Sequence, residues 1–153
     1  MARTKRVPFN YARRRQHFIL EKYCVEKYFP FLQCILRRKR LCCNGSITPF
    51  EGCGAYKIRI EYQEGKTPHV YIIDPHIKPN PEYHIYKDGS LCLFCPRESP
   101  WSSTMRIHET IIPWTAEWLV FYELWKLTGK WQGPEAPHTT TDTELEEPRK
   151  QIK

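Results

Sequence analysis

The feature that most constrains the fold is an alternation of apolar and charged side chains near the middle of the chain. Its apolar members are Tyr56, Ile58, Ile60 and Tyr62, and its charged members are Lys57, Arg59 and Glu61. A period of two predicts a half-buried strand of an antiparallel sheet. A turn at 64–66 leads to a second strand at 69–73, and residues 40–47 form a third strand unless Asn44-Gly45 makes a turn. Together these segments predict a small antiparallel meander.

Helical segments are expected on either side of this meander. From about Tyr11 to Leu36, apolar residues recur at spacings of three, four and seven, although Pro30 must kink this helix or start a second one. From about 113 to 127, aromatic residues recur at helical spacing and are expected in the core: Trp114, Trp118, Phe121 and Trp125. Gly129 is well placed to end that helix in a left-handed conformation. The order of elements predicts an α+β fold, with an N-terminal helix, an antiparallel β-meander, a long loop and a C-terminal helix.

The basic residues are concentrated in the first third of the chain. Residues 1–44 hold twelve of the 24 Lys and Arg residues but only two of the 17 Asp and Glu residues. Such a surface can bind nucleic acid or an acidic protein face, or it can be a solvated helix face with a basic tail. No apolar run is long enough to span a membrane and no signal peptide is visible, so we expect a cytoplasmic protein. Its seven cysteines are then expected to be reduced thiols, metal ligands or catalytic groups, and not a disulfide framework.

Residues 74–101 are rich in Pro, Gly and Asp and show no periodicity, which is typical of a loop that displays functional groups. Within this loop, Cys92 follows an Asp88-Gly89 turn and lies between two leucines, with His84 eight residues before it. A thiol can accept an acyl group as a thioester, and a nearby hydrogen-bond donor can stabilise the oxyanion when that group moves on. The alternative is a buried, inert cysteine, because free cysteine packs as a small hydrophobic residue.

A second thiol, Cys95, completes a Cys-x-x-Cys pair, and the spacing leaves three chemistries open. The pair can be a redox couple, although Pro96 is poorly placed for the helix that follows such motifs. It can be half of a zinc site whose other half comes from Cys42, Cys43, Cys53 or a histidine. Cys95 can also be a resolving thiol that forms a reversible disulfide with Cys92. No phosphate-binding glycine motif is visible, so an acyl group would have to arrive already activated.

The run from Asp88 to Leu93 resembles the active-site segment of ubiquitin-conjugating (E2) enzymes, which carries the acceptor cysteine. Over roughly residues 11–138, further segments follow in an order similar to that of the bacterial E2-like proteins of CBASS antiphage operons. These segments are Tyr56–Tyr62, Pro68–Tyr71, Asp74-Pro75, Trp101, Ile111–Trp114, Glu117–Leu119, Tyr122–Trp125 and Gly129–Trp131. The resemblance is to the short type II operons, which carry the E2-like protein without a fused E1 or a deconjugating peptidase.

This resemblance implies an E2/UBC-like fold and a thioester between Cys92 and the C-terminus of a cGAS-like nucleotidyltransferase. Transfer of that acyl group to an amine would prime the nucleotidyltransferase in antiphage defence. Ubiquitin E2 enzymes have a His-Pro-Asn triplet, and the position of its Asn is His84 here. That histidine is expected to donate to the thioester oxyanion or to act as a base, or else to cap the loop. Asp88 is expected to shape the turn, or to orient or deprotonate an acceptor lysine, and no cofactor is implied.

The expected organisation is a flexible basic arm over residues 1–10, an E2-like catalytic domain over 11–137 and a disordered tail over 138–153. Two rival interpretations stay open. One is a catalytically silent E2-like scaffold, and the other is a zinc-stabilised nucleic-acid-binding module that uses the basic first third. Under the E2 interpretation neither nucleic acid nor a membrane is an expected partner, and the residues leave open whether two copies form a homodimer.

Overall fold

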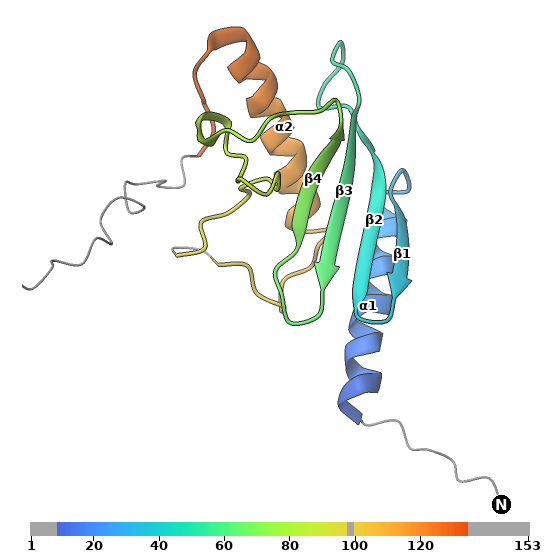
Figure 1. The fold of residues 1–153 in the computed structure, drawn as a ribbon. Helices are drawn as coiled ribbons and strands as arrows, with labels where there is room; N and C mark the ends of the chain where they lie inside the picture. The colour runs from blue at the N-terminus through green and yellow to red at the C-terminus, as the bar shows by residue number, and fades with distance from the viewer. Residues whose placement is uncertain (1–8, 98–99, 135–153) are drawn as a thin grey trace, which may run out of the picture.

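The computed structural model describes residues 9–97 and 100–134 (Figure 1). In chain order the elements are α1 (Phe9–Tyr28), β1 (Gln33–Arg37), β2 (Arg40–Ile47), β3 (Tyr56–Gln63), β4 (His69–Asp74), the short 3-10 helix η1 (Pro81–Tyr83) and α2 (Ile111–Thr128). The strands form one antiparallel sheet in the order β1-β2-β3-β4, and α1 packs against β1 and β2. Helix α2 is tied to β3 by a hydrogen bond from the Tyr56 hydroxyl to the Glu123 carboxylate. These elements confirm the α+β prediction.

Strand β3 is the centre of the core, because its alternating sequence buries one face of the sheet. All four apolar residues of the alternation are buried: Tyr56, Ile58, Ile60 and Tyr62. On the neighbouring strands, Leu41 lies opposite Tyr62, and Val70 lies opposite Ile60. Burying such side chains stabilises the fold by roughly 1.5–3 kcal/mol each. The three predicted strands are therefore confirmed.

The Asn44-Gly45 pair lies inside β2 and does not form a turn. Gly45 pairs with Ile58 on β3, and a Cβ atom there would lie 2.4 Å from the Phe31 carbonyl oxygen. A glycine is thus needed for the close approach of two backbone segments, and not for a reversal of the chain.

The first helix ends earlier than the sequence pattern predicts. Helix α1 stops at Tyr28, before Pro30, and the predicted continuation to Leu36 is wrong because residues 33–37 form strand β1. Proline has no N–H to continue the helical hydrogen bonds, and it disfavours helical geometry in the residue before it. Beyond the proline, Leu32 and Cys34 are buried on a period of two, which the helical interpretation overlooked.

A disulfide between Cys34 and Cys43 joins β1 to β2. The two residues lie directly opposite each other in the strand register, which brings their side chains together on one face. The expectation that the cysteines are reduced thiols, metal ligands or catalytic groups is therefore wrong for this pair. The other five cysteines, Cys24, Cys42, Cys53, Cys92 and Cys95, are free.

Helix α2 agrees with the sequence prediction at both ends. It runs from Ile111 to Thr128, and Gly129 ends it in the left-handed conformation with its N–H bonded to the Trp125 carbonyl oxygen. Trp118 is buried in the core, and the other aromatic residues of the stripe are half-buried.

The ends of the predicted catalytic domain are only partly described. Helix α1 begins at Phe9, so it already includes the last two residues of the predicted basic arm over 1–10. The remainder of that arm and the predicted tail over 138–153 lie outside the described residues. Of the helices in the described residues, none is long and apolar enough to cross a membrane.

Candidate active site

Residues 84–92 form a tight hairpin, called here the Cys92 hairpin. The Gly89 N–H donates to the Tyr86 carbonyl oxygen, and the Tyr86 N–H donates to the Ser90 carbonyl oxygen, both at 2.9 Å. Gly89 has a φ of 86°, a conformation that suits glycine, and this pattern is typical of a three-residue hairpin loop. The turn predicted from Asp88-Gly89 is therefore confirmed.

The Cys92 hairpin is attached to the edge of the sheet at β4. The Leu91 N–H donates to the Val70 carbonyl oxygen at 2.9 Å, and Ser90 forms an isolated bridge with Tyr71. Ile85 pairs with Leu91 across the hairpin, and both side chains are buried in the core. The sheet and the core thus hold the segment that carries Cys92 in one position.

Cys92 occupies the second arm of this hairpin, and its side chain is only 9% exposed. Its N–H donates to the His84 carbonyl oxygen at 2.9 Å, and its thiol donates to the Phe94 carbonyl oxygen, with Sγ and O 3.8 Å apart. Burial raises the pKa of the thiol, and a hydrogen bond from the Tyr86 hydroxyl lowers it to a lesser degree. In the resting protein Cys92 is therefore a neutral thiol at physiological pH.

His84 is buried at 6% exposure and follows η1 in a left-handed conformation with a φ of 60°. Its N–H donates to the Pro81 carbonyl oxygen at 3.2 Å, so its backbone caps η1. Its ring centroid lies 4.8 Å from that of Trp131, beyond the end of α2. The His84 backbone thus caps η1, while the role of its ring, catalytic or structural, stays a prediction.

Asp88 is exposed, and its carboxylate accepts hydrogen bonds from the Ser90 N–H at 2.9 Å and from the Ser90 hydroxyl at 2.6 Å. Burial acts to raise the pKa of this carboxyl group, but the two hydrogen bonds outweigh that effect and the pKa is lowered. Asp88 is therefore an ionised group that shapes the turn. Its predicted action on an acceptor lysine stays a prediction.

Cys95 is half-buried, is free, and lies near enough to Cys92 that a charge on its sulfur raises the pKa of Cys92. The proposed second half of a zinc site has lost one candidate, because Cys43 is bonded to Cys34. Among the described residues, no three His, Cys, Asp or Glu side chains come together in a way that could hold a metal ion.

Sequence reasoning assigned no chemistry to Tyr86, yet a hydrogen bond between its side chain and that of Cys92 lowers the pKa of the Cys92 thiol. The available signal was the spacing of two between His84 and Tyr86. In a hairpin this spacing puts both residues on the face that also carries Cys92.

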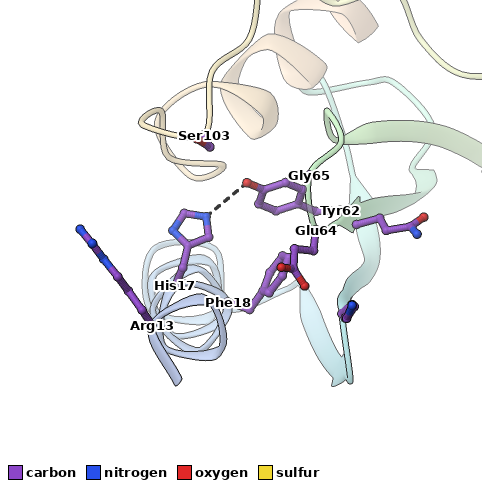
Figure 2. A pocket seen from close by; sticks show the side chains of 9 residues that line it. Arg13, His17, Phe18, Tyr62, Glu64, Gly65 and Ser103 are labelled. Atoms are coloured by element: carbon purple, nitrogen blue, oxygen red, sulfur yellow. Dashed lines mark hydrogen bonds between the residues drawn. The ribbon is translucent and has the colours of Figure 1, made fainter. Parts of the chain in front are cut away.

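A separate open pocket of about 740 Å³ lies where α1 meets the β1–β2 and β3–β4 turns (Figure 2). Its floor holds a hydrogen bond between the His17 ring and the Tyr62 hydroxyl, 3.2 Å apart. The basic first third of the chain contributes Arg13 and Lys39 to its lining, and no residue of the Cys92 hairpin lines it. Arg13 and Lys39 therefore line a pocket to which the Cys92 hairpin does not contribute.

The family model for the type II CBASS E2 protein matches residues 21–139, a range that includes the whole sheet, the Cys92 hairpin and α2. The chain belongs to the type II CBASS E2 family. A search among curated proteins finds no match. Family membership confirms the resemblance predicted from the sequence and gives this CBASS E2 protein a role in CBASS defence.

Proposed function

We propose that this CBASS E2 protein carries the C-terminal acyl group of a partner protein as a thioester on Cys92 and transfers it to an amine. The partner that the family context favours is a cGAS-like nucleotidyltransferase, which this modification would prime for signalling. The observation that carries the proposal is the placement of Cys92 on a hairpin fixed by backbone bonds to β4, in a chain of the E2 family.

The chemistry is two acyl transfers at one sulfur. In loading, Cys92 loses its proton, Sγ attacks the carbonyl carbon of an activated C-terminus, and the activating group leaves with its electron pair. In transfer, an amine attacks the same carbon, the C–S bond breaks, and the amine loses a proton as the amide forms. The products are an amide and the free Cys92 thiol, so the enzyme returns to its starting state.

A raised thiol pKa suits a carrier more than a fast nucleophile. A thiolate of high pKa is a poor leaving group, so the acyl group is retained until an acceptor is in place. Burial of Cys92 also keeps bulk water away from the thioester. This combination favours transfer to a bound amine over hydrolysis.

Three neighbours receive subsidiary roles in this proposal. His84 would supply a donor to the oxyanion or a base toward the amine, on a ring that Trp131 holds in place. Asp88, which is ionised, would orient the incoming amine. Cys95 would form a reversible disulfide with unloaded Cys92 under oxidation, which would close the site to acyl donors.

The test is co-expression with the operon neighbours, followed by a non-reducing gel and intact-mass analysis. The wild type should carry a thiol-labile adduct with the mass of a neighbour's C-terminal acyl group. Cys92→Ala should lose the adduct, and Cys92→Ser should give an ester that resists thiols. Cys95→Ala and Cys53→Ala, matched substitutions of half-buried free cysteines, should keep the adduct. An adduct that survives in Cys92→Ala would refute the proposal.

A catalytically silent E2-like scaffold is the second candidate, and the low exposure of Cys92 favours it. It predicts no adduct in any variant, together with stable binding of the nucleotidyltransferase by both wild type and Cys92→Ala. Binding of a partner without any adduct would therefore replace the carrier proposal with the scaffold.

A further inference from the structure

The two arms of the Cys92 hairpin place Tyr86 within reach of the reacting sulfur. Ile85 pairs with Leu91, and the Cys92 N–H bonds the His84 carbonyl oxygen, so position 84 is opposite 92 and position 86 is opposite 90. Since side chains alternate along each arm, Tyr86 and Cys92 lie on the same face as diagonal neighbours. Diagonal neighbours are within reach of each other when one of them is aromatic.

From this position Tyr86 shares a side-chain hydrogen bond with Cys92, which lowers the pKa of the Cys92 thiol. Burial and the neighbouring Cys92 sulfur both raise the pKa of Tyr86, so the phenol keeps its proton and remains a donor over the whole physiological range. The side chain is 38% exposed.

The other group in contact with the sulfur, the Phe94 carbonyl oxygen, favours the neutral thiol over the thiolate. The Phe94 carbonyl oxygen accepts a hydrogen bond from the neutral thiol, and it can offer nothing to a thiolate. The Tyr86 O–H can donate to the thiolate, which is the stronger acceptor. Sγ is therefore held between one group that favours the thiol and one that favours the thiolate.

The side chains of His84, Asp88 and Ser90 have contacts of their own. The His84 ring packs against Trp131, and the Asp88 carboxylate accepts two hydrogen bonds from Ser90. Asp88 is also an anion, so it would oppose formation of a thiolate. Tyr86, in contrast, has a hydroxyl donor that shares a hydrogen bond with the Cys92 side chain, so it can stabilise negative charge on sulfur.

We propose that Tyr86 is a catalytic residue, whose hydroxyl stabilises the Cys92 thiolate both as the nucleophile in loading and as the leaving group in transfer. The inference rests on the proposed carrier function. In loading, the thiol proton leaves to solvent and the sulfur electron pair forms the C–S bond. In transfer, the C–S electron pair returns to Sγ, and the Tyr86 O–H donates to the thiolate until it takes up a proton.

The test compares Tyr86→Phe with Tyr71→Phe, a matched loss of a hydroxyl on the neighbouring β4. The first readout is the rate of iodoacetamide alkylation at Cys92 against pH, measured by peptide mass spectrometry. One hydrogen bond to a charged group predicts roughly tenfold slower alkylation of Tyr86→Phe at neutral pH, with the profile displaced to higher pH. Tyr71→Phe should follow the wild type, and equal thermal melts exclude a folding defect.

The second readout is single-turnover discharge of the loaded protein to hydroxylamine, which should also be roughly tenfold slower in Tyr86→Phe. An alkylation profile identical to the wild type would overturn the inference, as would unchanged discharge despite a displaced profile. If the wild type forms no thioester, the carrier function fails. The alkylation profile then still decides whether Tyr86 stabilises the thiolate, so the two failures are distinguishable.

Discussion

Glu21 offers the sharpest test of how the structure is held together. Its carboxylate is fully buried, and it accepts hydrogen bonds from the Arg106 guanidinium at 3.0 Å and from the Ile107 N–H at 2.9 Å. These contacts join α1 to the segment that leads from the Cys92 region into α2. Glu21→Gln keeps the shape but removes the charge, and its amide N–H₂ would face another donor.

The expected cost is about 3 kcal/mol, because a hydrogen bond to a charged group contributes about 1.5–3 kcal/mol and breaking a buried ion pair costs about 3–5. Arg106 is partly exposed and can return to water, which keeps the figure at the lower end. For a chain of this size that corresponds to a melting temperature lower by roughly 6–12 °C.

Thermal denaturation followed by circular dichroism measures the effect directly. The matched control is Glu61→Gln, which removes the same charge from a partly exposed pair with Arg59 at 3.0 Å and should cost at most about 1 kcal/mol. If the two variants have the same melting temperature, the buried Glu21 contacts do not stabilise the fold and the reasoning fails.

Three further predictions concern the stability of the Cys92 hairpin, the reactivity of the Cys92 thiol and the stability of the fold at low pH. Gly89→Ala forces a residue with a side chain into a left-handed conformation, so it should lower the free energy of unfolding by about 1–2 kcal/mol in denaturant titrations. The sheet should be retained. An unchanged free energy of unfolding would refute the interpretation that this turn requires glycine. Because the pKa of Cys92 is raised, its alkylation at neutral pH should be slower in the native protein than after denaturation, and equal rates would contradict this. Burial raises the pKa of Glu123, but hydrogen bonds from Lys126 and Tyr56 outweigh it and the pKa is lowered. These contacts therefore stabilise the fold above the pKa of an unfolded glutamate, and the stability is lost as pH falls through the folded value. The melting temperature of Glu123→Gln should lie about 2–4 °C below that of the wild type at pH 6, and the gap should close toward pH 3.

Much of the fold could be predicted because its signals are local. The alternation at 56–62 requires only that one face of a strand be buried, and β3 buries those residues. The helical spacing of the aromatic residues and the position of Gly129 similarly predicted the extent of α2. The Asp88-Gly89 turn and the position of Cys92 after it also follow from neighbouring residues alone.

The wrong prediction of a helix over residues 32–36 arose because the apolar residues there fit both a helical and a strand periodicity. Leu32 and Leu36 satisfy a helical spacing of four, but Leu32, Cys34 and Leu36 also satisfy a period of two. Pairing with β2 decides in favour of the strand, and a partner strand cannot be seen in a local pattern. The same register brings Cys34 to Cys43, so the disulfide followed from the fold and not from cysteine spacing.

The sequence by itself determined strands β2, β3 and β4, the second helix, the turn and the thiol that it presents, because each depends on residues close together in the chain. Tertiary structure decided the surroundings of that thiol. The core holds Ile85 and Leu91 on one face of the hairpin, and this turns Tyr86 toward Cys92 on the other. The pKa of a buried group depends on what surrounds it in space, and those neighbours exist only once the chain has folded.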